Sequence, residues 1–544
     1  MRHLVAALLF WVLGAQAADP SKILRITFQA AETGFDPVRV SDYYSGTVIE
    51  AIFDPLLTYD YLARPARLVP NTALSLPEIT DKGRTYTVKV KPGIYFADDP
   101  AFKGAKRELT ALDYAYSMRR FLDPKNRSPY AFLFEGVAGI ETPGRYALVI
   151  RLKQPDYNFS HVLAFSLSGA VAREAIEAYG DESAARPVGT GPFRLKRYVR
   201  SSKIVLEANP GYREVIRDGQ RLPLIGGVEI SIMEETQSRW LAFQRGDTDI
   251  EYQLAEVAPT FITAQGELKP ELARRGIRLE RSVDPEIIYL YFNMQDRTVG
   301  GLSREKIALR RAIAMAYKVE DQIRIIRKGQ SIRAHYPIPP GVAGHDAQYR
   351  SSLAHDPRAA NALLDRFGYR KGADGFRRMP NGDALVIRYS STPSERDRQF
   401  DELMKRSLDA ISIRLDIHKD RFPELIKLEN QCRLMMRGAA WIADYPDGDN
   451  FMQLLYGPNT GQSNNACYRS PEYDKRYEKS RLLPHGPERD RLYREMTRLM
   501  EVHTVWLLTD SRYRNVLMQP RVKGFTKHPV LHAEWLYIDL ELPR

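Results

Sequence analysis

One aspartate stands in an apolar and aromatic setting that makes its negative charge costly. Asp444 lies in the segment WIADYPDGDNF (441–451), and its neighbours are Trp441, Ile442, Ala443 and Tyr445. A carboxylate removed from water is unfavourable unless a cation or hydrogen-bond donors meet it. The cation could come from one of the protein's own arginines or from a positively charged group on a bound molecule. Only the second source would make Asp444 a binding residue.

Two further aspartates in this segment have a different local sequence. Asp447 and Asp449 follow the turn residues Pro446 and Gly448. We predict them to be solvated loop positions.

Short signatures of enzymes and metal sites are missing from the sequence. It contains no G-x-S-x-G, no H-E-x-x-H, no P-loop and no G-x-G-x-x-G after a strand. His528 and His532 have the spacing of a metal-binding pair, but Pro529 between them argues against a helix. We therefore expect no metal site, no cofactor and no catalytic centre. Pairs of carboxylates in a cleft would still suit an exported hydrolase, either a peptidase or a glycosidase, and this alternative stays open.

The first seventeen residues have the pattern of a cleavable signal peptide. A short polar start at Arg2 and His3 precedes an apolar run (4–13) and an A-x-A cleavage site at 15–17. The apolar run is shorter than the roughly 20 residues of a membrane-spanning helix. No cysteine lies near the cleavage site, which argues against a lipid anchor. The pattern predicts a periplasmic protein that is free of the membrane.

Length and charge limit the remaining classes of protein. The chain has 544 residues, and a single core stops growing at roughly 250 to 300 residues, so at least two domains are expected. The net charge of +12 comes from 80 basic and 68 acidic residues in mixed order. This distribution indicates a solvated surface and no nucleic-acid site. The two cysteines, Cys432 and Cys467, flank the segment that carries Asp444, and they are either bridged or separately buried.

The elements that must position these residues alternate between strands and helices. Apolar residues alternate with polar ones at 24–30 and 86–90, as in half-buried strands. Thr110 with Asp113 forms a capping box, and Asp356 with Pro357 begins another helix. An amphipathic helix at 400–411 leads directly into a strand at 413–417, and Pro487 opens a helix near the C-terminus. The pattern predicts an α/β fold.

Four segments in one order carry a family resemblance. They are FDPLLTYD (53–60), GTGPFRL (189–195), ALRRAIAMAY (308–317) and WIADYPDGDNF (441–451). Behind an export signal, this set resembles the extracellular solute-binding proteins that serve ABC importers, in the branch that includes oligopeptide- and dipeptide-binding proteins. The resemblance runs from about residue 24 to about residue 542.

The resemblance implies a two-lobed periplasmic binding protein fold with an extra subdomain in the first lobe and hinge-crossing strands. Carried over to this chain, lobe one would be built from 19–58, 186–283 and 512–544. The extra subdomain would be 59–185, and lobe two would be 284–511. The GTGP turn would begin the return of the chain into lobe one.

The resemblance also implies a binding site for peptides. In such proteins the aspartate that matches Asp444 binds the α-ammonium group of the ligand. Trp441 and Tyr43 would form walls, with ordinary core positions as the alternative for each, and the backbones of Ala440 and Ile442 would contact the ligand from lobe two. The contacts from lobe one would come from the segment around Ser41, Asp42 and Tyr43.

One departure from the family pattern concerns the other end of the ligand. Some relatives place an arginine shortly before the tryptophan, where this chain has Gly438. Arg437 is one residue off and would face the opposite side of a strand. Peptide length and recognition of the ligand's C-terminus are therefore open.

The resemblance predicts a monomeric receptor that traps a peptide or peptide-like solute by hinge closure and delivers it to a membrane permease. The wider family includes binders of metal chelates and haem, so these solutes remain alternatives.

Overall fold

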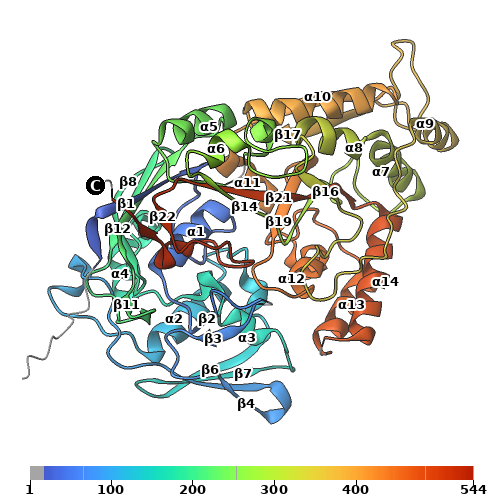
Figure 1. Ribbon diagram of the computed structural model, residues 1–544. Coiled ribbons are helices and arrows are strands. Elements are labelled where there is room, and N and C mark those ends of the chain that lie inside the picture. The colour runs from blue at the N-terminus through green and yellow to red at the C-terminus, as the bar shows by residue number, and fades with distance from the viewer. Residues whose placement is uncertain (1–17, 65, 253, 484, 543–544) are drawn as a thin grey trace, which may run out of the picture.

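Two large β-sheets, one in each half of the molecule, organise the chain (Figure 1). The structure is a computed structural model and describes residues 18–64, 66–252, 254–483 and 485–542. The predicted signal peptide lies outside the described residues. Among those that are described, no helix has both the length and the apolar character needed to cross a bilayer.

An eight-stranded sheet lies in the half that we call the first lobe. Its central strand β1 pairs in parallel with β12 and β13, and the outer pairings are antiparallel. Apolar residues of β1 and β12 alternate toward the core, as predicted for 24–30. In order, the sheet contains β14 (Arg278–Val283), β21 (Asp510–Met518), β13 (Ile250–Glu251), β1 (Asp19–Phe28), β12 (Ile225–Ile232), β9 (Lys203–Ala208) and β8 (Phe193–Val199), with β16 (Ser331–Arg333) on β21.

The second lobe is built on a five-stranded sheet. Its middle strand β15 has the sequence EIIYLYF and is buried along its whole length, as expected for a strand covered on both faces. Helices α7 (Arg304–Ala316), α9 (Pro357–Arg366) and α10 (Glu395–Asp409) contribute buried apolar residues to the core that includes this sheet. In order, the strands are β18 (Arg414–Lys419), β17 (Val386–Ser391), β19 (Met436–Ile442), β15 (Glu286–Phe292) and β20 (Trp506–Leu508).

A smaller antiparallel sheet falls within the predicted subdomain. It consists of β4 (Glu78–Thr80), β5 (Thr85–Lys89), β7 (Ala147–Leu152) and β6 (Val137–Gly144). Two-stranded sheets are formed by β2 (Leu57–Tyr59) with β3 (Leu68–Pro70), β10 (Ile216–Arg217) with β11 (Gln220–Arg221), and β22 (Val522–Lys523) with β23 (Asp539–Leu540). The proposed domain limits remain a prediction.

The helices begin where capping residues and prolines predict. Thr110 and Asp113 form the capping box of α2, the Asp356 carboxylate accepts from the Ala359 N–H at the start of α9, and Pro487 opens α14. The helices are α1 (Tyr43–Ile52), α2 (Ala111–Leu122), α3 (Phe159–Val162), α4 (Arg173–Tyr179), α5 (Thr236–Arg245), α6 (Pro270–Ala273), α7 (Arg304–Ala316), α8 (Val319–Asp321), α9 (Pro357–Arg366), α10 (Glu395–Asp409), α11 (Phe422–Asn430), α12 (Asp449–Met452), α13 (Pro471–Arg481) and α14 (Pro487–His503).

Two adjacent chain crossings connect the lobes. The chain passes from β14 to β15 at 284–285, and it returns from β20 to β21 at Thr509. Backbone bonds hold the two crossings together, from the Asp284 N–H to the Arg512 carbonyl and from the Thr509 N–H to the Ile288 carbonyl. Figure 1 shows β14 and β21 running between the halves. We refer to these crossings as the hinge.

The GTGP turn packs against the end of α1, where there is no room for side chains. A Cβ on Gly189 would lie 2.0 Å from the carbonyl oxygen of Ile52, and one on Gly191 would lie 2.6 Å from the same atom. The turn then enters β8, so its role is structural, in line with the prediction that it leads the chain back into strands.

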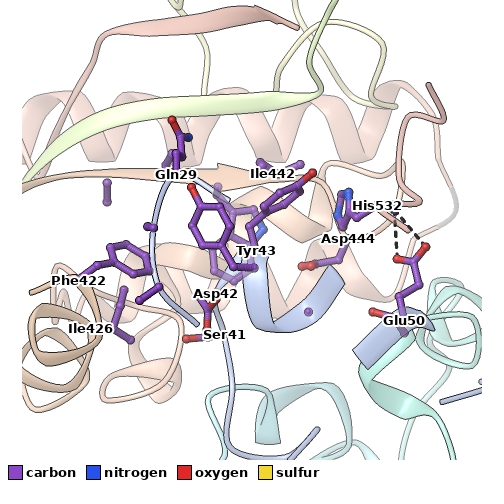
Figure 2. A pocket seen from close by; sticks show the side chains of 18 of the residues that line it. Gln29, Ser41, Asp42, Tyr43, Glu50, Phe422, Ile426, Ile442, Asp444 and His532 are labelled. Atoms are coloured by element: carbon purple, nitrogen blue, oxygen red, sulfur yellow. Dashed lines mark hydrogen bonds between the residues drawn. The ribbon is translucent and has the colours of Figure 1, made fainter. Parts of the chain in front are cut away.

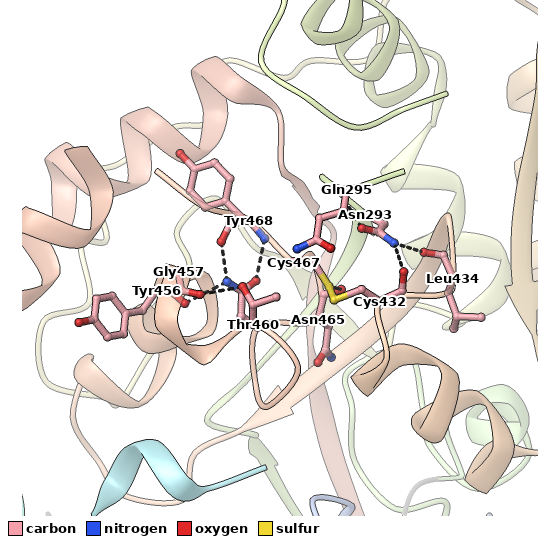
Figure 3. Close-up of a disulfide and its surroundings, with 11 residues drawn as sticks. Asn293, Gln295, Cys432, Leu434, Tyr456, Gly457, Thr460, Asn465, Cys467 and Tyr468 are labelled. Atoms are coloured by element: carbon pink, nitrogen blue, oxygen red, sulfur yellow. Dashed lines mark hydrogen bonds between the residues drawn. A yellow bond between two sulfur atoms is a disulfide. The ribbon is translucent and has the colours of Figure 1, made fainter. Parts of the chain in front are cut away.

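A disulfide joins Cys432 to Cys467 (Figure 3). Cys432 precedes β19, and Cys467 follows the loop that comes after this strand. Of the two arrangements left open by the sequence, the structure has the bridged one. The bridge joins the two ends of the segment that contains Asp444.

Candidate functional site

A cavity of about 710 Å³ lies between the two lobes. All seven residues predicted for the site line it, namely Ser41, Asp42, Tyr43, Ala440, Trp441, Ile442 and Asp444. Figure 2 shows that Asp42 and Tyr43 come from one wall and that Phe422 and Ile426 lie at the opposite end from Asp444. The fold therefore brings together two segments that are about 400 positions apart in the chain.

Asp444 is half-buried and has no cationic partner within the described ranges. Its Oδ2 accepts from the Asn450 amide at 2.8 Å, and the Tyr130 hydroxyl also bonds to it. Burial raises the pKa of Asp444 to about 7, although these two hydrogen bonds lower it in part. The protein thus supplies neutral donors to Asp444 and leaves its charge uncompensated.

Asn450 fixes the orientation of this carboxylate. Its amide group donates to Asp444, while its Oδ1 accepts from the Asp444 backbone N–H at 2.9 Å and from the Trp441 indole at 3.1 Å. Asn450 is buried, and it sits in α12 directly after the DYPDG turn. One side chain therefore joins the end of β19 to the turn that carries Asp444.

In the described part of the chain, one edge of β19 has no strand partner beyond Arg437 along the cavity. Its other edge pairs with β15 over its whole length, whereas β17 pairs only with Met436 and Arg437. The Gly438 N–H is bonded to the Tyr389 hydroxyl on the β17 side. Because alternate residues of a strand direct their N–H groups the same way, Ala440 and Ile442 direct theirs to this unpaired edge.

The segment from lobe one is held in place by the start of α1. The Asp42 carboxylate caps this helix, accepting from the Ser45 N–H at 2.8 Å, and it also accepts from the Thr33 hydroxyl. Burial raises the pKa of Asp42. The Tyr43 ring lies 5.7 Å from the Arg514 guanidinium, so Tyr43 stands where α1 meets β21.

Asp447 and Asp449 are buried, so the prediction that they are solvated loop positions is wrong. Asp447 pairs with Arg489 at 2.5 Å, and Asp449 accepts from the Tyr445 hydroxyl at 2.8 Å. Each is 6% exposed. The turn residues around them give no sign of these partners, because Arg489 lies in a distant helix.

Most arginines of the cavity are already paired. Arg437 is bonded to Glu429 at 2.8 Å and Arg512 to Glu286 at 2.5 Å. Arg396 bonds to Asp397 at 3.3 Å and to Gln29 of the first lobe at 3.1 Å. Arg421 is exposed at the cavity; its backbone N–H donates to Asp420 at 2.8 Å, but its guanidinium is bonded to no carboxylate in the described part of the chain.

Several residues of the site were missed from the sequence: Tyr130, Arg396, Arg421 and Glu50 line the cavity, and Asn450 bonds to Asp444. A signal existed for Arg396, because it stands in the first turn of α10, where the helix dipole disfavours a cation. Tyr130 comes from a loop of the predicted subdomain, and no local pattern marks it.

The two histidines with metal-like spacing do not act together. The His528 Nδ1 accepts from the backbone N–H groups of Val530 and Leu531. Among the described residues, no group of three or more metal-ligating side chains is placed to hold an ion.

A cavity between hinged α/β lobes, with an unmatched charge and an open strand edge, defines a solute-binding protein. The chain belongs to the bacterial extracellular solute-binding proteins, family 5, whose middle-region model matches residues 67–463. The family resemblance and the two-lobed α/β fold predicted from the sequence are thereby confirmed. The family is one of binding proteins.

Similar proteins span almost the whole chain. A di/tripeptide-binding protein 2 of Pseudomonas aeruginosa is 26% identical, covering 99% of both chains. A heme-binding protein A of Haemophilus influenzae is 25% identical, covering 83% of this chain and 80% of its own. The periplasmic binding protein DppA of Helicobacter pylori, solved with the peptide STSA, superposes with a TM-score of 0.83 at 22% identity, covering 96% of this chain and 98% of its own.

Proposed function

We propose that this protein captures peptides or peptide-like solutes between its lobes and presents them to the permease of an ABC importer. The observation that carries the proposal is Asp444, a half-buried carboxylate that lines the cavity without a cationic partner among the described residues. The α-ammonium group of a peptide supplies the missing charge. The name of the P. aeruginosa relative supports this class of ligand.

The open edge of β19 suits the backbone of such a ligand. An extended peptide adds to an unpaired strand through main-chain hydrogen bonds, which give affinity without requiring a particular sequence. The N–H groups of Ala440 and Ile442 point to this edge, and these residues precede Asp444 by four and two positions. Asp444 then sets the register by fixing the ligand's first residue.

The opposite end of the cavity suits the ligand's carboxylate. Phe422 and Ile426 of α11 lie there, and Arg421 directly precedes this helix (Figure 2). The Arg421 guanidinium is bonded to no protein carboxylate within the described ranges, so it can meet one from the ligand. A short peptide would run from Asp444 toward α11.

Contacts across the cavity mouth accompany closure. Arg396 of the second lobe donates to Gln29 of the first at 3.1 Å, and the Glu395 N–H donates to the Glu235 carboxylate at 3.2 Å. On the subdomain side, Arg481 pairs with Asp156 at 2.5 Å. A ligand favours this closed arrangement only by the contacts that it makes better there than in an open one.

The cellular setting of this function is also proposed. Cleavage after Ala17 would release the protein into the periplasm as a monomer, without a lipid anchor. Mass spectrometry of the periplasmic fraction should find a mature chain that begins at Ala18, and light scattering should give one copy per particle.

The test compares ligands and one variant by isothermal titration calorimetry. Di- to octapeptides are titrated into the wild type and into Asp444→Asn, with haem and a nickel–histidine complex as other solutes. The variant should lose about 3 to 5 kcal/mol of peptide affinity, because the ammonium group no longer meets a charge. Peptide at about 100 times its Kd should also stabilise the wild type by about 2.7 kcal/mol.

Two outcomes would contradict the proposal. If only haem or the nickel complex bound, the peptide class would be wrong and the family's other solutes would replace it. If peptides bound the variant as tightly as the wild type, Asp444 would have no role in recognition. Asp409→Asn, on the exposed face of α10, is the matched control and should bind like the wild type.

A further inference from the structure

A second carboxylate lines the cavity, beyond Asp444. Glu50 lies in the last turn of α1, and Figure 2 shows it with His532 on the same side as Asp444, away from Phe422 and Ile426. The side chain is half-buried. The proposed peptide site does not use this residue.

Backbone groups hold the Glu50 carboxylate in place. The His532 N–H lies 3.1 Å from its Oε1 and 3.2 Å from its Oε2, and the Ala533 N–H lies 3.1 Å from Oε1. In the part of the chain that the structure describes, no lysine, arginine or histidine side chain is bonded to it. Burial raises the pKa of Glu50 to about 7.

The cations of this region are engaged with other carboxylates. Lys527 is bonded to Glu534 at 2.6 Å, and Arg213 is bonded to Asp54 at 2.6 Å. The His532 ring stays neutral, because burial and the nearby charge of Lys527 hold its pKa well below the usual value. The negative charge of Glu50 is therefore available to pair with a cation of the ligand.

The walls around Glu50 are aromatic and aliphatic. The C-terminal segment that bonds Glu50 also lines the cavity with Leu531, Leu536 and Tyr537, and Tyr537 is close enough for the charge of Glu50 to act on its hydroxyl. Such walls suit a flexible aliphatic stem that carries a charge at its tip, which is the form of a lysine, ornithine or arginine side chain.

We propose that this end of the cavity selects a ligand with two cationic nitrogens joined by a short apolar stem, one bound by Asp444 and the other by Glu50. In a peptide these nitrogens are the α-ammonium group and the basic side chain of the first residue. The inference rests on the proposed function and narrows it to peptides that begin with a basic residue. A free diamine shares the same chemistry.

The experiment uses two peptides that differ only in the distal amine. Lys-Ala-Ala and norleucine-Ala-Ala are titrated into the full-length mature protein at pH 7.5, with Ala-Ala-Ala and cadaverine as further arms. The wild type should bind the lysine peptide at least about tenfold more tightly than the norleucine peptide, because only the lysine reaches Glu50 with a charge. Glu50→Gln should reduce this ratio to about one.

Controls separate the subsite from the rest of the site. Glu50→Gln keeps an acceptor for the backbone N–H groups and should bind Ala-Ala-Ala as the wild type does. Glu424→Gln, an exposed position on α11, should keep the full preference for lysine. If Glu50→Gln failed to fold by circular dichroism, the lysine-to-norleucine ratio of the wild type would decide by itself.

The outcomes distinguish a failure of this inference from a failure of the proposed function. Equal affinity for the lysine and norleucine peptides would overturn the inference and leave peptide capture intact. Cadaverine binding as tightly as the lysine peptide, with loss in Glu50→Gln, would support the two-cation subsite and identify a diamine as its source. If neither any peptide nor cadaverine bound, both proposals would fall.

Discussion

The buried carboxylates at the hinge and the half-buried ones in the cavity have opposite surroundings. At the hinge, Glu286 is bonded to Arg512 at 2.5 Å, Asp284 to Arg514 at 2.5 Å and Asp510 to Arg327 at 3.3 Å. In the cavity, Asp444 and Glu50 receive only neutral donors from the described residues. The same type of side chain thus forms ion pairs in one region, and in the other it has no cationic partner among the described residues.

The comparison shows which buried charges belong to the fold. A charge with a matched partner can be kept in every state of the protein, whereas a charge without one raises the free energy of the empty form. That difference favours any guest that supplies the cation.

The largest effect should come from breaking a pair at the hinge. Arg512→Met removes the partner of Glu286, which is fully buried. The free energy of unfolding should fall by about 3 to 5 kcal/mol, because an uncompensated charge remains inside the protein. Urea unfolding of the ligand-free protein measures this loss.

A matched control removes the cation of an exposed pair. Lys405→Met breaks the surface pair with Asp409 and should change stability by less than about 0.5 kcal/mol. Equal losses of unfolding free energy in the two variants would show that a hinge pair stabilises the protein no more than a surface pair does.

In the cavity, removing a charge should increase the stability of the empty protein, whereas at the hinge it should decrease it. Burial raises the pKa of Asp444 to about 7 from its usual 3.8, so the folded state binds the proton more tightly and stability falls as pH rises between these values. At pH 8 the full penalty is present. Asp444→Asn should therefore stabilise the empty protein at pH 8 by about 1 to 3 kcal/mol.

Thermal unfolding at two pH values checks this sign. The advantage of Asp444→Asn should be clear at pH 8 and nearly absent at pH 4, where the aspartate is protonated in the folded state. A variant less stable than the wild type at pH 8 would mean that the Asp444 charge supports the empty fold.

Peptide affinity should depend on pH in the opposite direction from stability. Below about pH 7, Asp444 must lose a proton before it can pair with an ammonium group, so affinity for Ala-Ala-Ala should weaken by up to about tenfold per pH unit. Above about pH 8 the α-ammonium itself titrates. Calorimetry between pH 5 and pH 9 should show a maximum near neutrality, and a flat profile below pH 7 would exclude Asp444 as the ammonium's partner.

The smallest effect concerns the residue that orients Asp444. Asn450→Ala should weaken peptide binding by about 1 kcal/mol through the lost hydrogen bonds. Because Asn450 also lowers the pKa of Asp444, the acidic limb of the binding profile should move to higher pH. Asn381→Ala, at an exposed turn, should leave both quantities unchanged, and an unmoved acidic limb in Asn450→Ala would reduce Asn450 to a packing role.

Much of the fold could be predicted from local patterns. The strand predicted at 24–30 overlaps β1, the helix predicted at 400–411 overlaps α10, and Pro487 begins α14. These patterns depend on neighbouring residues alone. The division into two lobes needed the family resemblance, because sheet order depends on pairings between distant strands.

Part of the site could be predicted from the sequence for the same reason. Asp444 could be singled out because its apolar neighbours are adjacent in sequence. Asp447 has a similar local setting beside turn residues, yet its partner Arg489 lies 42 positions away and could not be foreseen. Glu50 and the open edge of β19 depend on which segments the fold leaves uncovered, and a single sequence does not contain that information.

The unpaired edge of β19 has a consequence for what can enter. Bare strand edges on a protein surface invite other chains to join them, which is a route to aggregation. Here the bare edge lies inside the recess between the lobes, so a folded neighbour is too bulky to reach it. A slender, unfolded fragment fits this recess, so the enclosure of the edge favours unfolded molecules over folded ones before any side chain is recognised.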